Sequence, residues 1–406
     1  MMGDSVFWVW AQQVFGEGSA MPWYIHQNFP GGLEGFYRSG PRCWNALDYI
    51  TEQQAASLVK VQLEAARTKL EYVKKLGWSV VTPECEKYPG RLRNISDPPA
   101  VLYRKGRMPD CENLPVVAVV GARQATEESV DFSRAIGFQL ASGGAVVVSG
   151  GALGVDGAVL SGVISALGTG MSILPVDLDS PYLVRNMHLR SKLLETGGVL
   201  LSEYFSQRDP GRGSFHQRNR LITGFSHCVV LVQAGEKSGT MIYARHALKQ
   251  GRPLFVYPGP AGAPEFAGSR RLIREGARPV SSGWEILEYL SGLGIGAAPA
   301  ADRDRESPEE RTVLPLERED GPEPEKSLSA LLADSKEQTG HGEQVLKALE
   351  TGAKTIDELE DQTGLEAGEL LGILTQLELE GRVETGSGQR YSRKPAGKEA
   401  PWALDQ

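Results

Sequence analysis

The stretch from residue 116 to residue 157 reads VVAVVGARQATEESVDFSRAIGFQLASGGAVVVSGGALGVDG and decides the fold. Residues 116–120 form a short apolar, β-branched run, typical of a strand that is buried on both faces. This run ends at Gly121, and residues 145–148 give a second run of the same kind. A glycine-rich turn at residues 149–152 then leads into another helix near Val155. Both runs are therefore predicted to be buried strands followed by tight loops.

The segment between these two strands has the pattern of a helix. Thr126 is the predicted N-cap, and Glu127 and Glu128 lie in the first turn, where the helix dipole favours acids. Apolar residues then recur at four-residue spacing, at Phe132, Ile136 and Leu140. Strands that alternate with helices predict a parallel α/β sheet. Such sheets bind ligands at the carboxyl ends of their strands, where both loops lie.

The loop SGGALGVD at residues 149–156 is the first candidate site. Its glycines allow a close backbone approach, and the N–H groups of the following helix can bind an anion. The loop matches neither G-x-G-x-x-G nor a Walker A sequence, and a glycine turn needed only for packing is an equally good explanation of one such loop. Arg123, in the loop after the neighbouring strand, favours a phosphate site.

The stretch SFHQRNR at residues 214–220 is the second candidate. Arginines pair with phosphates and aromatic rings stack on bases, so Phe215, Arg218 and Arg220 suit single-stranded nucleic acid. The alternative is an arginine pair that forms salt bridges within the fold, with Phe215 in the core. We expect at least one of the two arginines to be structural. The loop EKSGT at residues 236–240 repeats the loop-then-helix arrangement, with Ser238 as the expected cap, and offers a third anion contact.

Composition limits the classes of protein that this chain can represent. With 406 residues we expect two or three domains. We expect no signal peptide and no membrane-spanning segment. The four cysteines are scattered without a C-x-x-C pair, which suits a reducing cytoplasm and argues against structural zinc. The six histidines form no metal-binding pair, so no metal and no cofactor are expected.

The net charge of −8 is unevenly distributed. Residues 302–406 carry 13 Lys and Arg against 25 Asp and Glu, whereas residues 1–301 carry 30 against 26. The front of the chain can therefore accept a polyanion, and the back would mostly repel one.

Four regions follow from these patterns. Residues 1–80 are predicted to be a helical domain of the SAM or helix–hairpin–helix type, with a helix capped by Thr51 and running to about Leu76. Residues 81–290 hold the α/β domain, with further strands at 172–176, 199–202, 228–233 and 254–257 and helices near 186–195, 219–224 and 240–250. Residues 291–340 are predicted to be a disordered acidic linker.

Residues 341–395 are predicted to form a winged helix. Thr355 and Glu358 make a capping box, and residues 383–385 and 390–392 suggest a hairpin. The third helix carries four acids, Glu366, Glu369, Glu378 and Glu380. Because these would repel phosphates, a protein-contact or regulatory module is preferred over a DNA reader.

The candidate site has many groups that can hold phosphate and few that can break a bond. No serine lies in a nucleophile elbow, and Asp156 is expected to fix the first turn of its helix rather than to act as an acid. We therefore predict a binding protein and not an enzyme.

Together these stretches resemble the DNA-processing protein A family, DprA, also called Smf. The resemblance is carried by Tyr88-Pro89 with Leu92, by DPPAVLY at residues 97–103 with Gly106, by VVGAR at residues 119–123, by residues 149–156, by Phe215 with RNRLI at residues 218–222, by residues 236–240, by Gly259-Pro260 and by GSRRLI at residues 268–273. It covers roughly residues 80–285, and the predicted winged helix also fits. The chain departs from the family at Ala122, where Ser is frequent, and at His216-Gln217, which replaces Pro and a frequently basic residue.

The resemblance implies an extended Rossmann-like core with an N-terminal helical domain and a C-terminal winged-helix domain. It implies a cytoplasmic, homodimeric protein that binds single-stranded DNA and loads the RecA recombinase during natural transformation, in competence and DNA recombination. The expected DNA-binding residues are Gly121, Arg123, Ser149, Gly150, Gly151, Ala152, Gly154, Asp156, Phe215, Arg218, Asn219, Arg220, Lys237, Ser238, Gly239 and Thr240.

Two other classes stay open from the sequence. One is a nucleotide-hydrolysing enzyme of the phosphoribohydrolase type, a related Rossmann-like fold with a P-G-G-x-G-T-x-x-E sequence. Here Gly239-Thr240 is present, but Tyr243 stands in place of the acid. The other is a nucleotide-sensing module.

Overall fold

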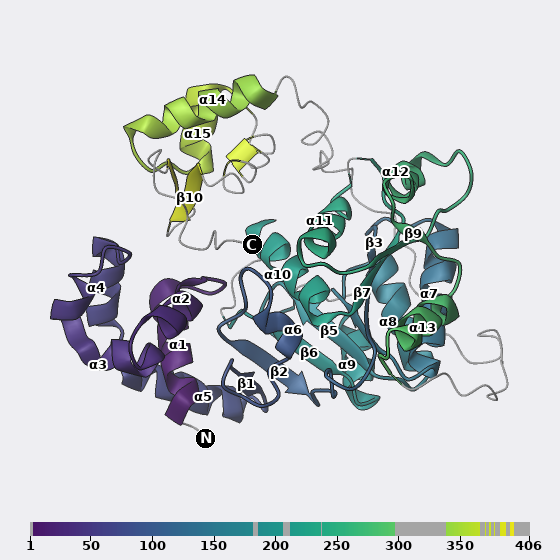
Figure 1. Ribbon diagram of the computed structural model, residues 1–406, viewed down its shortest axis with the longest axis horizontal. Coiled ribbons are helices and arrows are strands. Elements are labelled where there is room, and N and C mark those ends of the chain that lie inside the picture. The colour runs from purple at the N-terminus through teal and green to yellow at the C-terminus, as the bar shows by residue number, and fades with distance from the viewer. Residues whose placement is uncertain are drawn as a thin grey trace. The chain divides into compact units, whose positions relative to one another are not determined.

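The computed structural model describes residues 3–181, 186–205, 212–236, 238–296, 338–365, 370, 373–374, 377, 382–386 and 390–393 (Figure 1). The chain forms two compact units, one of residues 1–235 and 240–318 and one of residues 236–239 and 319–406. Most of the predicted acidic linker, residues 297–337, lies outside the described residues, as do Lys237 and the four acids of the third winged-helix helix.

A nine-stranded sheet forms the centre of the first unit, in the order β1-β2-β6-β5-β4-β3-β7-β8-β9. The pairs from β6 through to β9 are parallel, and β1 and β2 add an antiparallel edge. The strands are β1 Ser79–Val81, β2 Leu102–Gly106, β3 Val116–Gly121, β4 Val146–Ser149, β5 Gly170–Leu174, β6 Val199–Ser202, β7 Cys228–Val232, β8 Leu254–Val256 and β9 Arg278–Pro279. The predicted α/β class is confirmed, and β6 has its predicted bounds.

Helices cover both faces of this sheet. The helices of this region are α6 Gly90–Arg93, α7 Glu127–Ser142, α8 Val155–Ser165, α9 Met187–Glu195, α10 Arg212–Phe225, α11 Met241–Lys249, α12 Ala267–Arg274 and α13 Gly283–Gly292, with a 3-10 turn, η2, at Pro264–Phe266. Successive residues of β3 point to opposite faces. Val117 and Val119 pack with α7, α8 and α13, whereas Ala118 and Val120 lie in the core that includes α10 and α11. This explains why β3 is apolar at every position.

Helix α10 differs from its prediction. The sequence predicts a helix only over residues 219–224, but α10 begins at Arg212. Phe215 and Arg218 therefore lie on a helix and not in a loop before β7. Thr126 caps α7 as predicted, through its hydroxyl and the backbone N–H of Ser129.

Five helices precede the sheet, α1 Gly3–Phe15, α2 Met21–Asn28, α3 Gly32–Trp44, α4 Glu52–Lys60 and α5 Leu63–Lys75. Trp8 and Trp10 of α1 are fully buried among these helices. Thr51 does cap a helix, but that helix ends at Lys60 and not near Leu76. Val61 is extended, and its carbonyl accepts a hydrogen bond from the Trp10 indole at 2.8 Å, so tertiary packing breaks the helix there.

The N-terminal helices share one core with the sheet. Gln12 of α1 is buried, and its side-chain amide donates to the backbone oxygen of Glu203 at 3.1 Å, just after β6. The hydroxyl of Tyr103 in β2 donates to the same amide at 2.7 Å. These bonds fix α1 against the antiparallel edge of the sheet.

The second unit contains α14 Gln338–Ala348, η5 Leu349–Thr351, α15 Ile356–Thr363 and the antiparallel strands β10 Val383–Gly386 and β11 Arg390–Arg393. Its core includes Leu346, Leu359, Leu374 and Val383. The predicted capping box of Thr355 and Glu358 is present.

Candidate nucleic-acid interface

The sheet has a topological switch point at β3. The chain runs from β3 through β4, β5 and β6 on one side, and then returns to β7 on the other side of β3. The loops after β3 and β7 therefore lead away in opposite directions. The carboxyl ends of strands at such a point are the usual ligand position in open α/β sheets. Figure 1 shows β3 and β7 side by side.

Two predicted loops meet at this edge: the β3 loop, residues 121–126, and the glycine loop, residues 149–154. The backbone N–H of Val155 donates to the oxygen of Ala122 at 3.1 Å. Gly154 has a φ of 71°, and a Cβ there would lie 2.4 Å from the same oxygen. Only glycine fits this close approach. The prediction that Arg123 lies beside the glycine loop is confirmed.

Buried side chains hold the glycine loop from below. Ser149 donates to the oxygen of Val119 at 2.8 Å, and Asp156 accepts from the backbone N–H of Ala152 at 3.3 Å. Burial raises the pKa of Asp156, and the nearby charges of Arg218 and Arg123 oppose that rise. Asp156 lies in the first turn of α8, as expected for a residue that fixes the loop.

Asn186 is a supporting residue that sequence reasoning missed. Its buried amide donates to the oxygens of Gly151 at 3.1 Å and Ala152 at 2.8 Å. No local pattern signals this role, because Asn186 precedes α9 and is far from the loop in sequence.

Arg123 and Phe215 form the exposed part of the site. The Arg123 guanidinium lies over the Phe215 ring, 4.6 Å from its centroid, which is cation–π geometry. Arg123 is exposed and Phe215 half-buried. Within the described ranges no carboxylate lies within 4 Å of Arg123 to form an ion pair, so its charge is available to an incoming phosphate.

Arg218 does not line the surface as predicted. Its side chain is only 3 % exposed, and Nη1 donates to the oxygen of Ile173 at 2.7 Å. A Cβ on Gly150 would lie 2.0 Å from the same nitrogen, so the glycine loop passes directly over the guanidinium. Arg218 therefore supplies positive charge beneath the loop instead of a direct phosphate contact.

Arg220 is also buried, against the prediction that it contacts DNA. Its Nη1 and Nη2 donate to the two carboxylate oxygens of Glu203 at 2.7 and 2.9 Å, and Nε lies 2.7 Å from Asp97. Burial lowers the pKa of Arg220, but the charges of Glu203 and Asp97 outweigh that effect and hold it above its ordinary value. The prediction that at least one arginine of this pair is structural is confirmed.

Gln233 joins the two loops that flank the switch point, and sequence reasoning missed it as well. Its side chain accepts from the backbone N–H of Thr126 at 2.8 Å and donates to the oxygen of Gln124 at 3.1 Å. Its φ of +56° is rare outside glycine and typical of functional sites.

The rest of the predicted set is only partly placed. Asn219 is buried on α10, and its Oδ1 has no hydrogen-bond partner among the described residues. Thr240 is buried and is itself the N-cap residue of α11, two positions after the predicted cap Ser238. Ser238 and Gly239 belong to the second unit, and Lys237 is outside the described residues.

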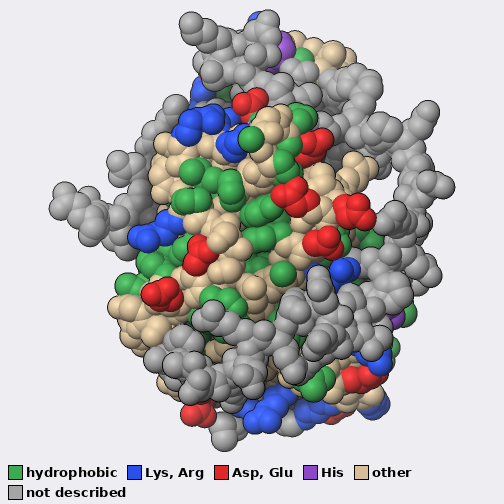
Figure 2. Space-filling view, turned by 90° about the vertical axis from the view of Figure 1, so that its right-hand side faces the viewer, with side chains coloured by type: hydrophobic (Ala, Val, Ile, Leu, Met, Phe, Trp, Pro, Cys, Tyr) green, Lys and Arg blue, Asp and Glu red, His purple; other side chains and the backbone are tan. Residues whose placement is uncertain are grey.

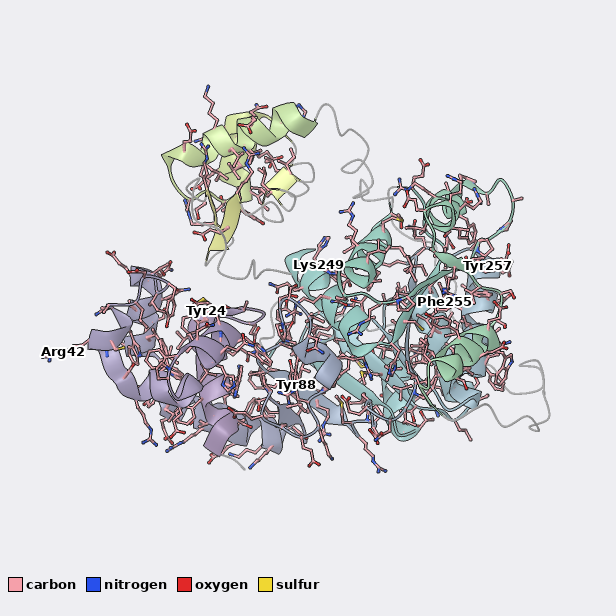
Figure 3. The ribbon with its side chains drawn as sticks, in the orientation of Figure 1. Tyr24, Arg42, Tyr88, Lys249, Phe255 and Tyr257 are labelled. Atoms are coloured by element: carbon pink, nitrogen blue, oxygen red, sulfur yellow. The ribbon has the colours of Figure 1, made fainter. Side chains whose placement is uncertain are left out.

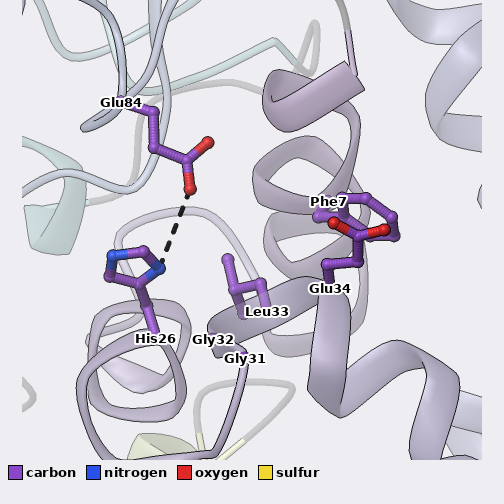
Figure 4. Close-up of a pocket in the computed structure, with 7 residues that line it drawn as sticks. All are labelled: Phe7, His26, Gly31, Gly32, Leu33, Glu34 and Glu84. Carbon is purple, nitrogen blue, oxygen red and sulfur yellow. Dashed lines mark ion pairs between the residues drawn. The ribbon is translucent and has the colours of Figure 1, made fainter.

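Two other parts of the surface suit an anion less well. A cavity of about 170 Å³ beside α2 and α3 is lined by two acids, Glu34 and Glu84, and His26 Nδ1 lies 3.8 Å from Glu84 (Figure 4). On the face that carries α7, α12 and α13, the visible described side chains mix acids, bases and apolar groups (Figure 2).

The described ranges hold no cluster of three or more His, Cys, Asp or Glu side chains placed to bind a metal. None of the helices described has both the length and the apolarity needed to cross a bilayer.

Two family models and several known proteins match this chain. Residues 79–291 match the family model of DNA recombination-mediator protein A, and residues 329–389 match that of the DprA winged helix domain. Protein Smf of Synechocystis is 28 % identical over 96 % of this chain and 99 % of its own length. DNA processing protein DprA of Bacillus subtilis is 32 % identical over 60 % of this chain and 84 % of its own.

The crystal structure of DNA processing protein A from Streptococcus pneumoniae is 26 % identical, with a TM-score of 0.54 over 61 % of this chain and 85 % of that one. The resemblance stated from the sequence is thereby confirmed. The two family models match the Rossmann-like core and the winged helix of this chain. The chain belongs to the DNA recombination-mediator protein A family, DprA/Smf.

Proposed function

We propose that this chain binds single-stranded DNA at the switch-point edge of its sheet and acts as a recombination mediator without catalysing a reaction. The observation that carries the proposal is the exposed Arg123–Phe215 pair beside the glycine loop. A guanidinium can hold a phosphate by two parallel hydrogen bonds, and a neighbouring ring can stack on a base.

Groups beneath and beside the site support the same proposal. Arg218 adds positive charge under the glycine loop, and the N-terminus of α8 directs backbone N–H groups toward the same edge. These features recognise the sugar–phosphate backbone and any base face, so they favour binding that depends little on sequence.

Family membership supports a finer proposal. We propose that the chain works in the cytoplasm as a homodimer and transfers bound DNA to a RecA-type recombinase in natural transformation or recombination. The acidic winged helix is proposed as a contact for protein and not for DNA, because its charge opposes phosphate binding.

Hydrolysis of a nucleotide is the competing function. Tyr243 stands where phosphoribohydrolases carry an acid, and burial raises its pKa to about 12. A neutral phenol of that kind is a poor general base at neutral pH.

The test measures binding of single-stranded and double-stranded oligonucleotides beside turnover of free nucleotides. Arg123→Ala should weaken single-stranded binding for all sequences alike. It should also make the negative slope of log K against log salt less steep by about 0.7. Arg123→Lys should recover part of the affinity, because an ammonium cannot form the two-pronged contact. Nucleotide turnover that Arg123→Ala abolishes, without measurable DNA binding, would instead identify an enzyme.

A further inference from the structure

Helix α11 presents a positively charged strip on its exposed face. Arg245 and Lys249 are exposed, and no ion pair to either occurs in the described part of the chain. Leu248 is 68 % exposed. Because residues three and four positions apart share one face of a helix, these three side chains lie together. We call Arg245, Leu248 and Lys249 the α11 strip; Figure 3 labels Lys249, the last residue of α11.

The α11 strip adjoins the helix that carries Phe215. The side-chain amide of Gln250, directly after α11, donates to the oxygen of Arg220 in α10 at 3.0 Å. His216, the neighbour of Phe215, is close enough to α11 for the charge of Arg245 to add to the effect of burial in lowering its pKa. The strip is thus fixed beside the Arg123–Phe215 site.

The charges that act on His246, which lies on α11 between Arg245 and Lys249, are mostly positive. Burial lowers the pKa of His246 to about 4; the charge of Asp97 opposes that effect, whereas Arg220, Lys249 and His216 add to it. Asp97 is itself paired with Arg220 at 2.7 Å. Because the pKa values of His216 and His246 are lowered, the positive charge of the strip is assigned to Arg245 and Lys249.

We propose that single-stranded DNA leaving the Arg123–Phe215 site continues over the α11 strip. Arg245 and Lys249 then contact phosphates, and Leu248 gives a base an apolar surface to lie against. Unpaired cations around an exposed apolar side chain are typical of an interaction surface, and phosphate is the ligand that two such cations favour. This inference rests on the proposed binding of single-stranded DNA and adds the direction in which the strand runs.

The experiment compares two oligonucleotide lengths on the full chain. A strand of about six nucleotides should fill the Arg123–Phe215 site, and one of about twenty should extend past it. The variant is Arg245→Ala with Lys249→Ala. The matched control is Arg42→Ala with Lys60→Ala, which removes the same charge from exposed positions of α3 and α4.

For the long strand, the α11 variant should make the negative slope of log K against log salt less steep, by about 0.7 for each cation removed. At 0.15 M salt this corresponds to a Kd that is about fourfold higher per cation. Binding of the short strand and the melting temperature should stay unchanged. The control should bind both lengths like the unmodified chain. Leu248→Ser should weaken only the long strand, with no change of slope.

An α11 variant that binds the long strand with an unchanged slope would overturn the inference. So would a variant whose only change is the mass of the chain in light scattering, which would make the strip a protein interface. Failure of the unmodified chain to bind either strand would contradict the proposed function itself, and is distinguishable from both results.

Discussion

The guanidinium of Arg123 lies 4.6 Å from the centroid of the Phe215 ring, although the two residues come from the loop after β3 and from helix α10. One face of the ring is therefore covered by a cation. A base that stacks on that face must displace the guanidinium. In the proposed function the two side chains would therefore act on DNA as a coupled pair.

Phe215→Leu should separate stacking from packing. Leucine keeps an apolar side chain on α10 but removes the aromatic face, so affinity for single-stranded DNA should fall by about 1–3 kcal/mol. Phe215 is half-buried, and the melting temperature should change little. Oligonucleotide anisotropy and thermal unfolding measure the two effects. A lowered melting temperature with undiminished affinity would place the ring in the core.

Gln233→Gly should weaken DNA binding with little effect on stability. Glycine accepts the φ of +56° without strain, which stabilises the fold by about 1 kcal/mol. It also loses both hydrogen bonds to the β3 loop, at about 1 kcal/mol each, so the gain and the loss in the free energy of unfolding partly cancel. The loop that carries Arg123 is then less well positioned.

Leu167→Gly is the matched control, since Leu167 also has a positive φ, +52°, and is 76 % exposed. It should stabilise the chain by up to about 1 kcal/mol and leave affinity unchanged. Equal DNA affinity of the Gln233→Gly variant and the unmodified chain would show that the bridge has no part in binding.

Glu203→Gln should destabilise the fold by about 3–5 kcal/mol, because Arg220 keeps a buried charge and loses its two-pronged partner. The double variant Arg220→Met with Glu203→Leu should regain much of that loss in denaturant titrations. While folded, it should bind DNA with an unchanged salt slope. A negative slope that is less steep by about 0.7 would show that Arg220 contacts DNA after all.

Stability should fall as the pH falls, partly through His227. Its Nδ1 accepts from the backbone N–H of Val116 at 3.0 Å, and burial, helped by the charges of Arg91 and Arg252, lowers its pKa from 6.5 to about 4. Between these values the unfolded chain binds more protons than the folded one, so the free energy of unfolding decreases toward low pH.

His227→Gln can still accept the Val116 hydrogen bond but does not titrate. Its free energy of unfolding, measured in denaturant at several pH values, should therefore decline less steeply between pH 6.5 and 4 than that of the unmodified chain. Identical slopes would exclude His227 as a source of the pH dependence.

Local chemistry was sufficient for the elements whose signals lie in neighbouring residues. The apolar runs at β3 and β6, the Thr126 cap of α7 and the capping box of α15 all stand where the sequence places them, because burial on both faces and capping each depend on a few adjacent side chains. The positions of the glycine loop and of Arg123 at one sheet edge followed from the same patterns.

The sequence by itself thus determined the fold class and the family, and it placed Arg123 and Phe215 among the predicted DNA contacts. Only the tertiary structure decided that Arg218 and Arg220 are buried, because their partners, Ile173 in β5 and Glu203 just after β6, are distant in sequence. The same holds for Asn186 and Gln233, whose side-chain amides bond to backbone groups of distant loops. An arginine or an amide reads the same in sequence whether it faces water or a buried partner; the difference arises when the sheet brings β3 between β4 and β7.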